Sequence, residues 1–187
     1  VSKGTVIRRL RELDPGLIHS VSATTRAMRP GEIDGVSYHF VTRERFERMI
    51  IDGEVLEHDE YCGNYYGTPI APLAEASAAG TDVVMDVTVP GSLAVMERMK
   101  DAVSIFLLPP SFSELRRRLE KRGTERPEEM ERRLEKARYE LGKASLFDYV
   151  VMNDDVDRAA GLILSITRAE KCRYRRVAGI EDTIIRK

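Results

Sequence analysis

The chain has 187 residues, 42% of them hydrophobic, which is enough to bury the core of one compact domain. Its 30 lysines and arginines against 31 aspartates and glutamates leave a net charge of -1, so no overall basic field favours nucleic acid as a partner. No apolar run approaches the roughly 18 residues of a membrane span, and the start shows no signal-peptide pattern, so we expect no membrane partner.

The cysteines and histidines form no metal-binding pattern in the sequence. Cys62 and Cys172 lie far apart without CxxC spacing, and the three histidines are scattered along the chain (His19, His39, His58). We therefore expect no metal bound by a set of the chain's own ligands, and a reduced, cytoplasmic setting.

Helical and strand-like patterns alternate along the chain, which favours an α/β fold with a mostly parallel sheet covered by helices. Gly53 and Gly80 separate successive elements, and the first helix stops at a Pro-Gly turn. In the first half, the patterns predict helix Thr5–Leu13, strand Leu17–Val21, helix Arg43–Asp52, strand Glu54–Tyr61 and helix Pro69–Ala79.

The second half continues the same alternation. Ser111 is a predicted cap of a helix that runs to Arg122, and Pro127 suits the first turn of the next helix. The remaining predicted elements are strand Val83–Val87, helix Ser92–Met99, strand Val103–Leu108, strand Tyr149–Met152 and a closing helix that begins at Asp155 or Asp157.

The loop after the first predicted strand holds side chains suited to a phosphate. Arg26, Arg29 and Tyr38 lie in a stretch broken by glycine and proline. Guanidinium forks match phosphate oxygens in pairs, and a phenol adds a neutral donor. Taken alone, the segment is also compatible with solvated loop arginines.

The arginine loop is one of several short motifs that stand in a fixed order along the chain: Lys3-Gly4-Thr5, the arginine loop, Glu57, Gly63-Asn64-Tyr65-Tyr66-Gly67-Thr68, Arg122-Gly123-Thr124 and Asn153-Asp154-Asp155. Together they resemble guanylate kinase from end to end. The resemblance implies one domain over residues 1–187 with a P-loop kinase-type parallel sheet flanked by helices. It places the core at 1–28 and 72–187, a small GMP-binding insertion at about 29–71 and a short lid at about 122–136.

The same resemblance implies ATP-dependent phosphorylation of GMP to GDP in purine nucleotide metabolism, with ATP and GMP as substrates and Mg²⁺ entering with ATP. Guanine presents adjacent N1–H and N2–H donors, so one carboxylate such as Glu57 can accept both, whereas adenine has an acceptor at N1. The implied GMP-binding residues are Ser22, Arg26, Arg29, Tyr38, Glu57, Tyr66, Thr68 and Asp86.

Several of these side chains also have a plainer interpretation. Glu57 alone could be a solvated strand carboxylate, and Tyr65 and Tyr66 could be packing aromatics with wet hydroxyls. Asp86 could be a turn residue at a strand end. Their spacing relative to the arginine loop favours the site.

On the donor side, the resemblance assigns ATP binding to Ser2, Lys3, Gly4, Thr5 and Asn153, and catalysis to Lys3, Arg26, Arg122 and Arg133. The run Arg116-Arg117-Arg118 is instead expected to be a solvated helix face paired with Glu114 and Glu120.

The sequence departs from the family pattern at two places. Ser2 stands at the second glycine of the motif G-x-x-x-x-G-K-[ST], with Gly4 at its last position, and Thr88 stands where the family usually has a second carboxylate after Asp86. We expect an apolar strand and a glycine-rich turn before Val1 in the natural chain.

Two alternatives therefore remain open: a catalytically weakened guanylate-kinase-like interaction module, and a kinase for another phosphorylated small molecule. Lys3 and the basic lid favour an enzyme, and Glu57 with Thr68 favours guanine. The sequence gives no oligomeric state.

Overall fold

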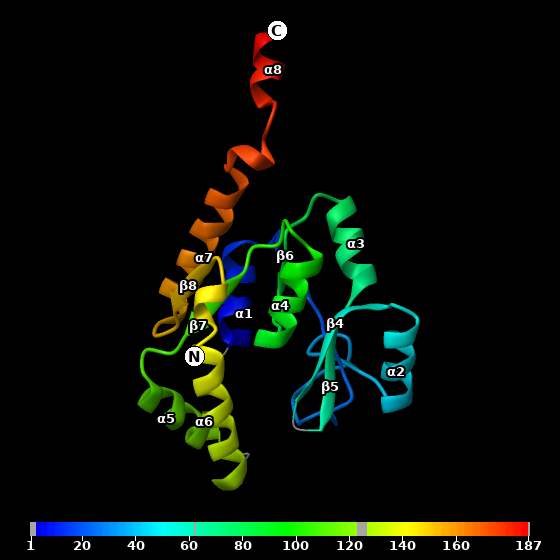
Figure 1. Ribbon diagram of the computed structural model, residues 1–187, viewed down its shortest axis with the longest axis vertical. Coiled ribbons are helices and arrows are strands. Elements are labelled where there is room, and N and C mark those ends of the chain that lie inside the picture. The colour runs from blue at the N-terminus through cyan, green and yellow to red at the C-terminus, as the bar shows by residue number, and fades with distance from the viewer. Residues whose placement is uncertain (1–2, 62, 123–126, 187) are drawn as a thin grey trace. The chain divides into compact units, whose positions relative to one another are not determined.

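The computed structural model describes residues 3–61, 63–122 and 127–186. Contacts within the chain divide it into two compact units. The terminal unit comprises Val1–Leu10 and Ile105–Lys187, and the central unit comprises Arg11–Ser104. Both contain parallel strand pairs and helices, so the predicted α/β fold is confirmed (Figure 1).

The central unit holds a two-stranded sheet and a four-stranded sheet. In the first, β1 pairs in parallel with β6, with Ser20 opposite Met85. The second has the order β3-β2-β5-β4, in which β5 is antiparallel to both of its neighbours and β2 is parallel to β3. The elements of the central unit are β1 (Ile18–Ser20), β2 (Ala23–Thr24), β3 (His39–Phe40), α2 (Arg43–Ile51), β4 (Val55–Tyr61), β5 (Asn64–Pro69), α3 (Ile70–Ala78), β6 (Val83–Met85) and α4 (Val89–Arg98).

The terminal unit is built around the parallel pair β7 and β8, in which Ile105 lies opposite Tyr149. Among the described residues, no helix of the chain is both long enough and apolar enough to cross a membrane. The elements are α1 (Lys3–Leu13), which begins in this unit, then β7 (Ile105–Leu108), α5 (Phe112–Arg122), α6 (Pro127–Leu141), β8 (Tyr149–Met152), α7 (Val156–Lys171) and α8 (Ile180–Ile185), with short 3-10 turns at Ala144–Leu146 and Tyr174–Arg176.

Polar side chains fix where several helices begin. Ser111 Oγ accepts the backbone N–H of Glu114 at 3.0 Å, which confirms the predicted cap, and Asp155 Oδ1 accepts that of Arg158 at 2.9 Å, so Asp155 is the start of the closing helix. Thr88 does the same for α4, which therefore begins at Val89 rather than at the predicted Ser92.

Three strands were not predicted from the sequence. β2 and β3 have two residues each, too few to show an alternating pattern. β5 contains Asn64, Gly67 and Pro69, residue types that are depleted in strands. Pairing with β4 and β2, which the local sequence does not reveal, makes this segment a strand.

The tail after α7 is attached to the terminal unit through Glu170, which is 4% exposed. Its carboxylate accepts hydrogen bonds from the Tyr149 hydroxyl at 2.5 Å and from Arg173 at 3.0 Å, and these partners lower its pKa. The basic tail segment thus has a structural role that the sequence did not indicate.

The core of the central unit lies on both sides of β4. On one side, the fully buried Phe46 packs with Ala23, Met49 and Val55, and the Tyr65 ring stacks on it at 5.3 Å. The second cluster joins β4 to α3, α4 and β6 through Leu56, Leu73, Val95, Val83 and Met85.

The register of β4 shifts between Val55 and His58. Val55 and Leu56 belong to the two clusters on the two sides of β4, and Glu57, the next residue, is buried as well. A carboxylate is therefore placed in the interior directly beside the two apolar clusters.

We predict that Phe46→Ala destabilises the protein by about 3–5 kcal/mol, because it leaves a cavity beneath the Tyr65 ring. Ile51→Ala, on the same helix but at a position that is 82% exposed, is the matched control and should change the free energy of unfolding by less than about 0.5 kcal/mol. Urea denaturation measures both, and equal effects of the two substitutions would contradict the packing described for α2.

Candidate active site

The arginine loop is shaped by a tight turn at residues 29–32. Pro30 occupies the second position of the turn and Gly31 the third, with a φ of 84°, and the Glu32 N–H donates to the Arg29 carbonyl at 3.1 Å. Only glycine adopts such a φ without strain, and proline is favoured at the position before it. The turn directs Glu32 back toward the start of the loop.

Glu32 holds the Arg26 guanidinium in a bidentate ion pair. Its carboxylate oxygens lie 2.8 and 3.0 Å from the two terminal nitrogens of Arg26, and the side chains are only 20% and 12% exposed. The pair lowers the pKa of Glu32 and raises that of Arg26. Sequence reasoning missed Glu32, although a carboxylate six residues after Arg26 in the same loop was a usable signal.

A second turn places Tyr38 beside Arg26. Gly35 has a φ of 73°, and its N–H donates to the Tyr38 carbonyl at 2.8 Å. The Arg26 guanidinium carbon lies 5.4 Å from the centre of the Tyr38 ring, which meets the Tyr66 ring edge-on at 6.0 Å. Three of the predicted phosphate ligands are therefore brought together.

The surroundings of Tyr38 raise the pKa of its phenol. Burial is the main cause, and the negative charge of Asp86 is the next. The charge of Asp86, another predicted site residue, thus acts on Tyr38. A protonated Tyr38 can donate a hydrogen bond to a phosphate oxygen.

The Glu57 carboxylate is 5% exposed and accepts a hydrogen bond of 2.6 Å from the Thr68 hydroxyl. Burial raises its pKa, and the bond from Thr68 opposes that shift in part. The plainer interpretation of Glu57 as a solvated strand carboxylate is therefore wrong. Thr68 is itself 1% exposed, so the pair is an interior feature.

The other predicted acceptor residues have simpler surroundings. The Ser22 carbonyl accepts the His39 N–H at 2.9 Å, which joins the loop to β3. Arg29 is exposed, and its backbone N–H donates to Glu32 at 2.7 Å. Their contacts with a nucleotide stay predictions.

The predicted donor residues belong to the terminal unit. Lys3, Gly4 and Thr5 form the first turn of α1, where backbone N–H groups favour an anion. Asn153 follows β8 and is 5% exposed, with its backbone N–H bonded to the Leu108 carbonyl at 2.7 Å. Ser2 and the side chain of Arg122 lie outside the described residues.

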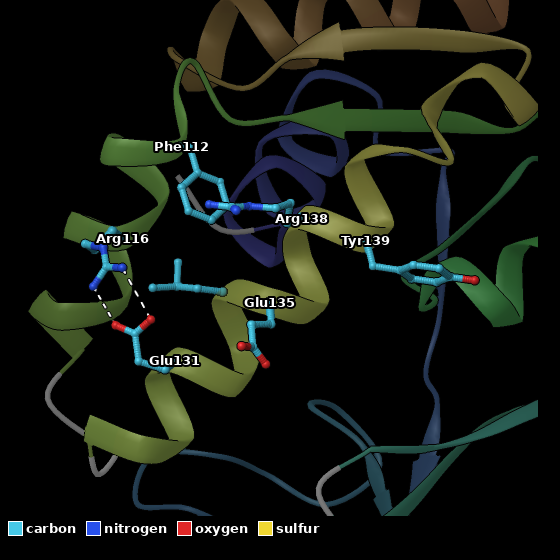
Figure 2. Close-up of a pocket in the computed structure, with 7 residues that line it drawn as sticks. Phe112, Arg116, Glu131, Glu135, Arg138 and Tyr139 are labelled. Carbon is cyan, nitrogen blue, oxygen red and sulfur yellow. Dashed lines mark hydrogen bonds and ion pairs between the residues drawn. The ribbon is translucent and has the colours of Figure 1, made fainter.

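Helices α5 and α6, which carry Arg122 and Arg133, border a pocket of about 460 Å³ (Figure 2). Its walls contain none of the predicted site residues. The Arg116–Glu131 ion pair at 2.7 Å links the two helices, and Glu131 is a partner that the sequence did not indicate. Arg117 and Arg118 do pair with Glu114, each at 2.7 Å. The pocket is lined by Phe112, Arg116, Glu131, Leu134, Glu135, Arg138 and Tyr139.

The fold is that of an α/β nucleotide kinase. The structure is similar to the crystal structure of guanylate kinase from Anaplasma phagocytophilum, with a TM-score of 0.82 and 37% sequence identity over 96% of this chain and 87% of that one. The sequence profile of the family described as guanylate kinase matches residues 5–170.

Curated sequences agree with the structural comparison. A guanylate kinase from Symbiobacterium thermophilum is 47% identical over 100% of this chain and 89% of its own length. One from Halalkalibacterium halodurans is 48% identical over 95% of this chain and 87% of its own. The chain belongs to the guanylate kinase family. Our predictions of this family and of an enzyme are confirmed, and the full-length matches favour the kinase over the interaction module.

Proposed function

We propose that the chain transfers the γ-phosphoryl group of ATP to the phosphate of GMP and releases ADP and GDP. An oxygen of the GMP phosphate forms the new bond to the γ-phosphorus as the bond to the β-phosphate oxygen breaks, and its electron pair leaves with ADP. The buried Glu57–Thr68 pair carries the proposal, because it gives the acceptor site a preference for guanine.

The preference for guanine follows from the donors and acceptors on the base. An ionised carboxylate only accepts hydrogen bonds, so Glu57 can take both the N1–H and the N2–H of guanine. Adenine would place its N1 lone pair against the same carboxylate. Because Glu57 is 5% exposed, a mismatched base leaves a desolvated charge without compensation, which is a large penalty.

The acceptor phosphate would bind next to the cluster of Arg26, Tyr38 and Tyr66. Glu32 engages both terminal nitrogens of Arg26, so the guanidinium is already oriented before the substrate arrives. Preorganised donors of this kind lose little entropy on binding. Arg29 lies on the exposed turn of the same loop and supplies a second guanidinium fork.

On the donor side, we assign Lys3 and the first turn of α1 to the ATP phosphates, and Asn153 to the adenine. Lys3, Arg26, Arg122 and Arg133 would neutralise the charge that develops on the transferring group. The first-turn N–H groups of α1 and the positive end of its dipole support this assignment. The predicted insertion at 29–71 and lid at 122–136 would exclude water from the reaction.

Mg²⁺ would enter as part of the substrate MgATP, held mainly by phosphate oxygens and water. Among the residues that the structure describes, no group of three or more His, Cys, Asp and Glu is arranged to hold a metal ion. The ion would reduce the negative charge of the donor phosphates, while the side chains named above would position the two nucleotides.

A coupled assay of ADP release tests the proposal with GMP, with AMP and without an acceptor. We predict that Glu57→Gln lowers GMP turnover by about 10- to 1,000-fold, because an amide cannot accept both guanine donors. Glu60→Gln, an exposed position on the same strand, is the matched control and should retain wild-type turnover. Unchanged GMP kinetics in Glu57→Gln would exclude Glu57 from guanine recognition.

Calorimetry with GMP and guanosine tests the phosphate site separately. Arg29→Ala removes a charge-assisted contact, so GMP affinity should fall by about 10- to 150-fold, or roughly 1.5–3 kcal/mol, while guanosine affinity stays the same. Arg48→Ala, an exposed arginine on α2, should affect neither. Equal binding of GMP and guanosine by the wild-type protein would mean that the phosphate site does not exist.

A further inference from the structure

Gly91 lies directly against the Glu57 carboxylate. A Cβ atom built on Gly91 would be 2.5 Å from Glu57 Oε2 and 3.1 Å from its carboxyl carbon. Real Cβ atoms essentially never approach another heavy atom within 3.0 Å. The carboxylate therefore occupies the space that any other residue at position 91 would fill.

The backbone at this position does not itself call for glycine. Gly91 is the third residue of α4, and the glycines with positive φ lie elsewhere in the described chain. Alanine is a better helix former than glycine, because glycine loses more conformational entropy on folding. The remaining reason for a glycine at position 91 is the space that the Glu57 side chain occupies.

A cap fixes where α4 begins, and contacts in its second half hold it against β4. At the start, Thr88 Oγ1 accepts the Gly91 N–H at 3.2 Å. Further along, Val95 packs against Leu56, and the Arg98 guanidinium donates to the Leu56 carbonyl. Because the helix is fixed in this way, a new side chain at position 91 would displace the carboxylate rather than the helix.

The two carboxylate oxygens of Glu57 have different neighbours. Oε1 accepts the Thr68 hydroxyl at 2.6 Å, whereas Oε2 faces Gly91. Displacing Oε2 while Thr68 retains its hydrogen bond to Oε1 would tilt the plane of the carboxylate. A tilted carboxylate cannot present both oxygens to the same pair of adjacent donors.

We propose that Gly91 is a positioning residue that sets specificity: its missing side chain allows both Glu57 oxygens to meet the two adjacent donors of guanine. The inference rests on the proposed function of Glu57. Thr88 contributes through the cap that fixes the start of α4, which gives this departure from the family pattern a structural role.

The test compares GMP with IMP, whose base keeps N1–H but lacks the 2-amino group. We expect Gly91→Ala to raise the KM for GMP by about 10- to 100-fold with a smaller change in kcat, and to raise the KM for IMP less. The preference for GMP over IMP in kcat/KM should fall by about 10-fold. In a Glu57→Gln background the same substitution should leave this preference unchanged, because the two residues act together.

Gly161→Ala is the matched control, since it replaces a glycine inside helix α7 where a Cβ would meet no heavy atom within 4 Å. Gly161→Ala should keep or raise the midpoint of thermal unfolding, whereas in Gly91→Ala the gain in helix propensity is offset by the displacement of a buried carboxylate. A Gly91→Ala protein with the wild-type preference for GMP over IMP would overturn the inference, whatever its midpoint of thermal unfolding. A wild-type protein that does not phosphorylate GMP would instead refute the proposed function.

Discussion

The proposed guanine site depends on one buried carboxylate. Glu57 is 5% exposed, and burial raises its pKa above the ordinary value of 4.5. Between 4.5 and that raised pKa, the unfolded chain gives up the proton first, so the free energy of unfolding falls as the pH rises through this window. An ionised Glu57 thus costs stability at neutral pH. A base that donates two hydrogen bonds would stabilise the charged form, which is how a destabilising residue can serve recognition.

In the proposed phosphate site the buried charge is positive. Arg26 is largely buried, and the bidentate pair with Glu32 compensates its charge. The Pro30-Gly31 turn makes that pair possible, because it returns Glu32 toward Arg26. A short loop segment therefore both orients the guanidinium and leaves Arg29 exposed at its tip.

Much of the fold could be predicted from local patterns. Helix α2 and strand β8 match their predicted ranges to within one residue, because apolar periodicity and turn residues bound them. Strand β5 was not predicted, since its glycine and proline suit a strand only in the presence of β4. Gly67 packs against the Glu57 carbonyl and the Phe46 ring, a constraint between segments distant in sequence.

The sequence predicted the residues of the candidate site better than it predicted the contacts between them. Motif spacing identified Arg26, Tyr38, Tyr66 and Glu57, but not the residues that hold them in place. Glu32 and Gly91 act through geometry that appears only when the loop and α4 are folded against their neighbours. Division of the chain into core, insertion and lid stays a prediction.

The most direct test of guanine recognition by Glu57 is an NMR titration of its carboxyl carbon with and without GMP. We predict a pKa above the ordinary glutamate value in the free protein and a marked decrease of this pKa on GMP binding, because two N–H groups then donate to the charged form. AMP should cause no such decrease. A Glu57 pKa that does not respond to GMP, or that responds equally to AMP, would contradict the role of this carboxylate in reading guanine.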